Sequence, residues 1–180
     1  MHWIRDRKGL MYKVKATGNK QKSAAEAAYS FLSARMRTCH ETEEHLRSKG
    51  YSEDEILETV NDLIGMKYID DYQYALRYYE YNREKHRGSA RAAAELLKRG
   101  VDADTVKFAR EDFLHENHVS EYEDALDAAE RELDLRDPRT GEEYRAVIDD
   151  RTAAKIARKL DSKGFERGDI FRVLEELRRR

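Results

Sequence analysis

Three stretches of the chain repeat the same order of apolar and polar positions. The order is leucine, two variable residues, a basic residue, glycine, an apolar residue, four variable residues and a β-branched residue. The copies span 46–56, 96–106 and 160–170. An arginine also stands at one shared offset before each glycine, at Arg37, Arg87 and Arg151. Agreement at this many offsets indicates a tandem repeat.

Each copy is typical of a helix end, a tight turn and a helix start. Gly50, Gly100 and Gly164 can adopt φ > 0 just after a helix, and the basic residue before each glycine suits the negative end of the helix dipole. Two residues after each glycine stands a candidate N-cap, which is Ser52, Asp102 or the weaker Glu166. Apolar residues flank each cap as a hydrophobic staple. We therefore expect a helix–turn–helix pair in every copy.

A further helix is predicted ahead of each pair. A shift of fifty residues superposes Ala24, Ala25, Ala28 and Tyr29 on Tyr74, Ala75, Tyr78 and Tyr79, which share one helix face. Each unit is then three helices, nine in all. The same spacing predicts the buried positions of the second helices: Cys39, Thr42, Leu46; Ser89, Ala92, Leu96; Ala153, Ile156, Leu160. For the third helices it predicts Ile56, Val60, Leu63; Val106, Ala109, Phe113; Ile170, Leu174, Leu177.

The repeat predicts an all-α, elongated and curved stack of three three-helix units. The expected bounds are a basic N-terminal arm at 1–22, then units at 23–70, 71–119 and 120–180. The glycine spacing rises from 50 to 64, so the third unit should carry an insertion at 134–144, an exposed loop around the only proline. Alternation at Tyr12, Val14 and Ala16 leaves a short strand, a hairpin or a disordered arm open for residues 1–22.

Composition supports a stack with a thin core. The 180 residues are 40% charged and 39% hydrophobic, against about 25% and about 45–50% in average domains. Small helical units tolerate this, because each contacts only its neighbours. One cysteine excludes an internal disulfide and favours a reducing, cytoplasmic location. No apolar run is long enough to span a membrane.

Charge is uneven along the chain. Residues 1–22 carry a net charge of +6, although the whole chain carries −2. Residues 83–100 are also basic, and Arg83, Lys85 and Arg91 should be an exposed subset. The candidate partner-binding residues are Arg77, Arg83, Lys85, Arg87, Arg91, Lys98, Arg99 and Tyr72. The alternative is an ordinary solvated face.

Six tyrosines between 68 and 81 would suit stacking on single-stranded nucleic acid. The fifty-residue shift instead assigns Tyr74, Tyr78 and Tyr79 to the core and leaves Tyr72 as the most exposed.

No group of residues predicts catalysis, a cofactor or a metal. Glycine-rich phosphate loops are absent. Cys39 and His40 are adjacent, so they point apart on a helix, and a structural cysteine is the better interpretation. Glu111, His115 and His118 have metal-ligand spacing, but exposed helices often carry such groups. Asp70 and Asp71 are better explained as caps of the helix that follows.

The central residues resemble a known regulatory family. Tyr68-Ile69-Asp70-Asp71, followed by Tyr74, Ala75 and Tyr78, is similar to the central motif of RecX regulatory proteins. So is Arg87-Gly88 followed by Glu95-Leu96 and Lys98-Arg99-Gly100-Val101. Leu160 with Lys163-Gly164-Phe165 resembles the last repeat of that family. The similarity covers about residues 24–180, without residues 1–22 and the insertion. Its structural motif residues are Gly50, Gly100, Gly164, Tyr68, Asp70 and Asp71.

The resemblance implies a non-enzymatic protein, expected to be a monomer, that binds RecA and the RecA–DNA filament. It would restrain strand exchange, ATP hydrolysis and repressor self-cleavage, and make at most weak direct contact with DNA. One alternative is a helix-turn-helix module that acts on DNA directly. Acidic positions on the third helices oppose it: Glu53, Asp54, Glu55, Glu58, Asp62, Asp102, Asp104, Glu111 and Asp112. Another alternative is an unrelated helical scaffold.

Overall fold

The computed structural model describes residues 2–5, 11–14, 22–116, 120–133 and 148–180. These residues form one antiparallel hairpin, β1 (His2–Arg5) with β2 (Met11–Val14), in which His2 lies opposite Val14. They also form the nine predicted helices: α1 (Ala24–Leu32), α2 (Cys39–Ser48), α3 (Glu53–Gly65), α4 (Asp71–Glu84), α5 (Ser89–Lys98), α6 (Ala103–Glu116), α7 (Glu121–Leu133), α8 (Asp150–Lys163) and α9 (Arg167–Arg179). None of the described helices is long and apolar enough to cross a membrane.

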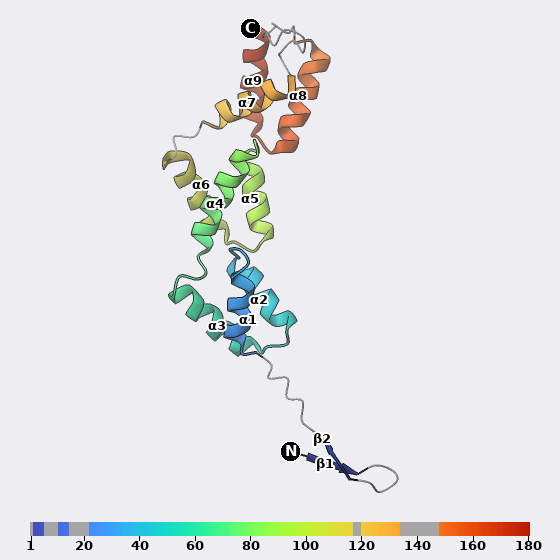
Figure 1. Cartoon of the computed structure of the whole chain (residues 1–180). Helices are drawn as coiled ribbons and strands as arrows, with labels where there is room; N and C mark the ends of the chain where they lie inside the picture. Colours follow the sequence, from blue (N-terminus) through green and yellow to red (C-terminus); the bar gives the residue numbers. More distant parts are fainter. Residues whose placement is uncertain (1, 6–10, 15–21, 117–119, 134–147) are drawn as a thin grey trace.

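The helices form three successive groups along one elongated stack, α1–α3, α4–α6 and α7–α9, here called units 1, 2 and 3 (Figure 1). Each unit surrounds a hydrophobic cluster of its own, within residues 24–69, 74–113 and 125–177. The predicted all-α repeat fold is therefore confirmed. The predicted insertion at 134–144 lies outside the described residues.

The turns follow the predicted local chemistry. Gly50, Gly100 and Gly164 have φ of 87°, 77° and 84°, each just after a helix end. Ser52 forms a capping box with Glu55. Asp102 Oδ2 accepts hydrogen bonds from the N–H groups of Asp104 and Thr105, at 3.0 and 3.1 Å. Glu166 precedes α9 without a side-chain capping bond, as its residue type suggested.

The second and third helices bury almost all of the predicted positions. Cys39 is only half-buried, and Leu174 is partly buried where Val173 is fully buried. On α9 the buried stripe is Ile170, Val173 and Leu177, with the same spacing as Val106, Ala109 and Phe113 on α6. The prediction of Leu174 was wrong, because the buried residues of α9 follow the spacing of α6 and not that of Ile56, Val60 and Leu63 on α3.

The predicted core face of α1 was partly wrong. Ala25 and Tyr29 are exposed, and Ala27 is buried instead. On α4 the corresponding Ala75 and Tyr79 are buried. The two helices therefore present faces that differ by a rotation about the helix axis, because α1 packs through alanines where α4 packs through tyrosine rings.

The shared arginine offset does not give one shared position in the fold. Arg37 and Arg87 precede α2 and α5, but Arg151 lies inside α8. The reason is that α8, which begins at Asp150, extends further at its N-terminal end than α2 and α5 do.

Candidate partner-binding surface

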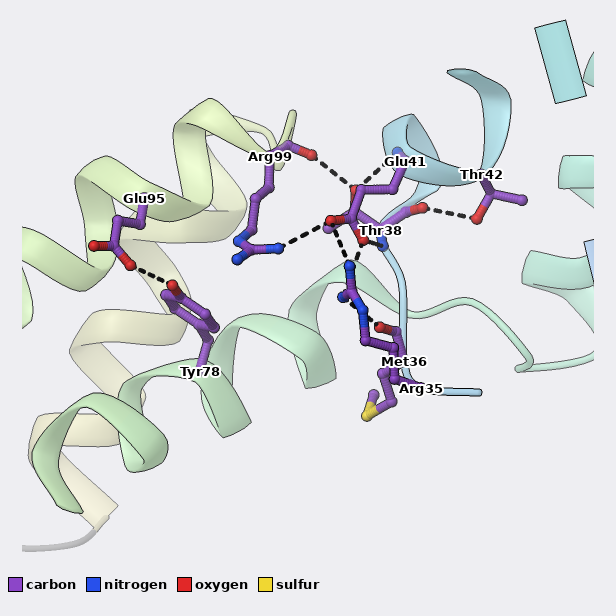
Figure 2. Close-up of polar contacts among 8 residues, drawn as sticks. All are labelled: Arg35, Met36, Thr38, Glu41, Thr42, Tyr78, Glu95 and Arg99. Atoms are coloured by element: carbon purple, nitrogen blue, oxygen red, sulfur yellow. Dashed lines mark hydrogen bonds and ion pairs between the residues drawn. The ribbon is translucent and has the colours of Figure 1, made fainter. Parts of the chain in front are cut away.

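The second helices of units 1 and 2 meet end to end. Thr38, the N-cap of α2, is fully buried and donates its hydroxyl hydrogen to the carbonyl oxygen of Arg99 at 2.8 Å. Arg99 in turn donates from Nη1 to Glu41 Oε1 at 2.9 Å (Figure 2). Arg35 adds a second guanidinium, 3.3 Å from the same Glu41 oxygen. The start of α2 is thus fixed against the end of α5.

The second helices of units 2 and 3 meet in the same way. The N–H of Gly88, the N-cap of α5, donates to the carbonyl oxygen of Lys163 at 3.1 Å. Arg91 Nη1 donates to the carbonyl oxygen of Ser162 at 2.9 Å. In both junctions the positive end of one helix dipole faces the carbonyl end of another, which is favourable.

An acidic residue at the start of the next unit completes each junction. Asp71 Oδ1 accepts a hydrogen bond from the N–H of Cys39 at 2.9 Å, and Glu121 Oε1 accepts one from Ser89 at 3.1 Å. Each satisfies an N–H in the first turn of the preceding unit's second helix. Asp70 caps its own helix through the N–H of Gln73 at 3.0 Å. The capping prediction was right for Asp70 and wrong for Asp71, which caps α2 instead.

Arg110 links units 2 and 3, and the sequence interpretation missed it. Its guanidinium donates to Ser89 Oγ, Glu121 Oε2 and Glu166 Oε1 at 2.7, 2.7 and 2.6 Å. Arg110 stands at the repeat position that holds Val60 in unit 1. A charged residue at an otherwise apolar repeat position was the signal that could have identified it.

Most of the predicted binding arginines hold the stack together. Arg83 donates to Asp124 Oδ2 of α7 at 2.9 Å, and Arg91 and Arg99 lie in the junctions described above. Arg87 is half-buried and close enough to lower the pKa of Glu95. The prediction that Arg83, Lys85 and Arg91 form an exposed subset was therefore wrong for Arg91, and Arg83 is tied to unit 3.

Three predicted cations remain on the surface of unit 2. Arg77, Lys85 and Lys98 are all exposed. The Lys85 ammonium lies 5.7 Å from the centre of the Tyr81 ring, and Tyr81 is 47% exposed. Along α4 the ring centroids of Tyr74 and Tyr78 are 6.1 Å apart, and those of Tyr78 and Tyr81 are 6.3 Å apart. Exposed cations therefore lie on α4, just after it and at the end of α5, with one accessible aromatic ring on α4.

Tyr72 is not the most exposed tyrosine of this segment. It is half-buried, and its hydroxyl hydrogen-bonds to the Asp112 carboxylate, which joins α4 to α6. Tyr68 and Tyr81 are more exposed, and the Tyr68 ring packs edge-on against Tyr29 at 5.1 Å. Tyr74 and Tyr79 are buried, as their repeat positions predicted, whereas Tyr78 is only half-buried.

The titratable groups with shifted pKa values in this region have structural roles. Burial, with the nearby Asp71 carboxylate, raises the pKa of the Cys39 thiol to about 12. Cys39 is therefore protonated at neutral pH and is not a nucleophile. A hydrogen bond from the Tyr78 hydroxyl and the Arg91 guanidinium lower the pKa of Glu95. Glu111 and His115 are exposed on α6, and His118 lies outside the described residues.

Sequence comparisons relate this chain to regulatory proteins. A family model described as RecX, first three-helix domain, matches residues 24–63. Regulatory protein RecX of Bacillus licheniformis is 29% identical over 160 residues, which cover 88% of this chain and 57% of the relative. The Clostridium botulinum protein of the same name is 27% identical, and the match covers 91% of this chain and 74% of the relative. The Bacillus subtilis protein is 33% identical, and the match covers 58% of this chain and 40% of the relative. The chain thus spans about half the length of these Bacillus relatives.

Solved structures share the fold. The crystal structure of RecX from Lactobacillus salivarius superposes with a TM-score of 0.67 at 28% identity, covering 89% of this chain and 97% of the other. A second RecX crystal structure superposes with a TM-score of 0.66 at 21% identity. The second likeness concerns the fold alone.

Proposed function

Because this chain belongs to the RecX family of regulatory proteins, we propose that it binds the filament formed by the RecA recombinase on DNA and mostly inhibits it. The affected activities are strand exchange, ATP hydrolysis and the stimulation of repressor self-cleavage. Membership of the RecX family is the observation that carries this proposal. The protein acts by occupying a surface, so no catalytic residue, cofactor or metal is assigned.

The junctions support this mode of action. The contacts of Thr38 with Arg99 and of Gly88 with Lys163 fix successive units in a defined direction. A stack of fixed direction can contact several protomers of a helical filament at once. Linked contacts multiply in affinity, because the later ones form at high effective concentration.

The exposed cations of unit 2 are the proposed contact residues. Arg77, Lys85 and Lys98 can meet acidic protomer surfaces or DNA phosphates. In this proposal Arg83, Arg87, Arg91, Arg99 and Tyr72 contribute indirectly, by maintaining the shape of the stack. Direct DNA binding through the third helices is disfavoured, because Glu53, Asp54 and Glu58 are exposed on α3 and repel phosphate.

The test is RecA ATP hydrolysis on single-stranded DNA, titrated with this protein at fixed DNA. We expect inhibition at well below one protein per RecA protomer. When the titration is repeated with more DNA, the inhibition should be unchanged. A module that only sequesters DNA would lose its effect as DNA increases. An unrelated scaffold would leave the rate unchanged at every ratio.

A charge-reversal variant locates the contact. Arg77→Glu, Lys85→Glu and Lys98→Glu together should abolish inhibition, while thermal unfolding stays close to that of the parent. The matched control is Lys107→Glu, Lys155→Glu and Arg158→Glu, which makes the same charge change at exposed positions of α6 and α8. Full inhibition by the first variant, or an equal loss of inhibition in the control, would show that the contact does not lie on these residues of unit 2.

A further inference from the structure

Among the described residues, the C-terminal end of the second helix is covered in units 2 and 3 and open in unit 1. A Cβ added at Gly100 would lie 2.3 Å from His40 Cβ, and one at Gly164 would lie 2.3 Å from Arg91 Cβ. Each of these turns is therefore packed against the start of a neighbouring unit's second helix. A Cβ at Gly50, the equivalent position after α2, would meet nothing within 4 Å among the described residues.

A cavity of about 450 Å³ adjoins this open end. It lies along α1 and the C-terminal half of α2 and is lined by Lys22, Ala27, Ser30, Phe31, His45, Lys49 and Tyr51. In unit 2 the positions of Ala27 and Ala28 hold Arg77 and Tyr78, which have much larger side chains. The small side chain of Ala27 borders the cavity.

The surroundings of the cavity are cationic and aromatic. The Arg37 guanidinium lies 4.2 Å from the centre of the Phe31 ring, and the His45 ring stacks on Phe31 at 4.0 Å with the planes 2° apart. Arg37 Nε is buried and has no hydrogen-bond partner among the described residues. Burial, with the positive charges of Lys49 and Arg37, lowers the pKa of His45. An acidic group is the complement of such a site.

We propose that the open end of α2 docks the N-terminal end of a helix from a partner protein, with a hydroxyl residue at its N-cap and an acid three residues later. Unit 1 presents this arrangement to unit 2: Thr38 contacts the Arg99 carbonyl, and Glu41 contacts the Arg99 guanidinium. Lys49 stands at the position of Arg99 and supplies a cation at the same place. The junction of units 1 and 2 is the template for this partner, because the cationic surroundings of the cavity favour an acid. The junction of units 2 and 3 has Gly88 and Arg91 at the same two positions.

The helix end distinguishes this partner from nucleic acid. The C-terminal end of α2 presents backbone carbonyl groups and the negative end of a dipole, which favour N–H and O–H donors. A helix start offers such donors together with its acid. A phosphate backbone offers an acid but no N–H donor, so it would attract the Lys49 ammonium and be repelled by the carbonyl groups.

The probe is a peptide that copies residues 36–48 of this chain, acetylated and held helical by a hydrocarbon staple between positions 44 and 48, which are exposed in α2. It is titrated into the 180-residue chain, and the backbone amide signals are followed by NMR. We expect saturable shifts at Lys49, Gly50 and Tyr51 and in the His45 ring. RecA is absent, so the result is independent of the function proposed above.

Matched variants test each contact. A peptide with Thr38→Val or Glu41→Gln should bind about threefold to tenfold more weakly, the range expected for one lost hydrogen bond or ion pair. Lys49→Glu in the protein should weaken binding similarly or more, and Ser30→Trp, at an exposed position lining the cavity, should block it. Lys107→Glu makes the same charge change as Lys49→Glu on α6 and should bind like the parent.

Three outcomes would overturn the proposal. The first is no saturable shift around Gly50, or equal binding of the parent and Glu41→Gln peptides. The second is a stronger response of the same residues to an oligothymidylate, which would make the end a nucleic-acid site. The third is the same shifts on raising protein concentration without peptide, which would make the occupant a second copy of this chain.

Discussion

The three turn glycines form a matched set for measuring how tightly the units are joined. Each follows a second helix, and their φ values lie between 77° and 87°. They differ in what an added methyl group would touch: no described residue at Gly50, His40 at Gly100, and Arg91 at Gly164. We propose Gly50→Ala, Gly100→Ala and Gly164→Ala as three single variants, with Gly50→Ala as the internal control.

The expected loss of unfolding free energy has two parts. A left-handed residue with a side chain costs about 1–2 kcal/mol, which applies to all three variants. Overpacking a closed contact costs about 1–3 kcal/mol more, which applies only to Gly100→Ala and Gly164→Ala. The total is then about 1–2 kcal/mol at Gly50 and about 2–5 kcal/mol at the other two. Gly164→Ala should cost at least as much as Gly100→Ala, because its Cβ would also lie 2.9 Å from the Arg91 backbone nitrogen.

The assay is urea unfolding followed by far-ultraviolet circular dichroism. In a stack of units, a weakened junction also reduces cooperativity, so Gly100→Ala and Gly164→Ala should broaden the transition. Gly50→Ala should shift the midpoint without broadening it. The contrary result is that the three variants lose equal amounts of unfolding free energy, with equal dependence of that free energy on urea. That result would refute the close contact at the two junctions and leave backbone strain as the only cause.

Further predictions concern single contacts and the N-terminal segment. A double-mutant cycle of Glu41→Ala and Arg99→Ala should give a coupling energy of about 0.5–1 kcal/mol, since both side chains are partly exposed; additive losses would contradict the pairing. The Cys39 thiol, with its pKa raised to about 12, should react slowly with iodoacetamide at pH 8.5 in the folded protein and rapidly in urea; equal rates would show that the thiol is accessible. Stability linked to this thiol is complete below its unfolded pKa near 9 and is lost as pH rises towards 12. Deletion of residues 1–22, which carry +6, should weaken filament binding at low salt and much less near physiological salt; loss of inhibition at every salt concentration by a folded deletion variant would assign the function to that segment.

The sequence by itself determined the repeat, the turns and most of the core. Gly50, Gly100 and Gly164 adopt positive φ, and Ser52 and Asp102 cap the helices that follow. These features depend on residues within one or two helical turns of each other, so spacing along the chain reveals them. The fully buried leucines Leu46, Leu96 and Leu160 were identified for the same reason.

The tertiary structure decided which charged residues are available to a partner. Arg83, Arg91 and Arg99 resemble Arg77 and Lys98 in sequence, but their partners Asp124, Ser162 and Glu41 lie 41, 71 and 58 residues away. Asp71 likewise caps a helix that begins 32 residues before it. Such contacts depend on how one unit is placed against the next, and the rotation of α1 relative to α4 shows that this placement depends on the volumes of all the side chains between the helices. The repeat pattern records which positions are apolar, and it does not record those volumes or the distances they set.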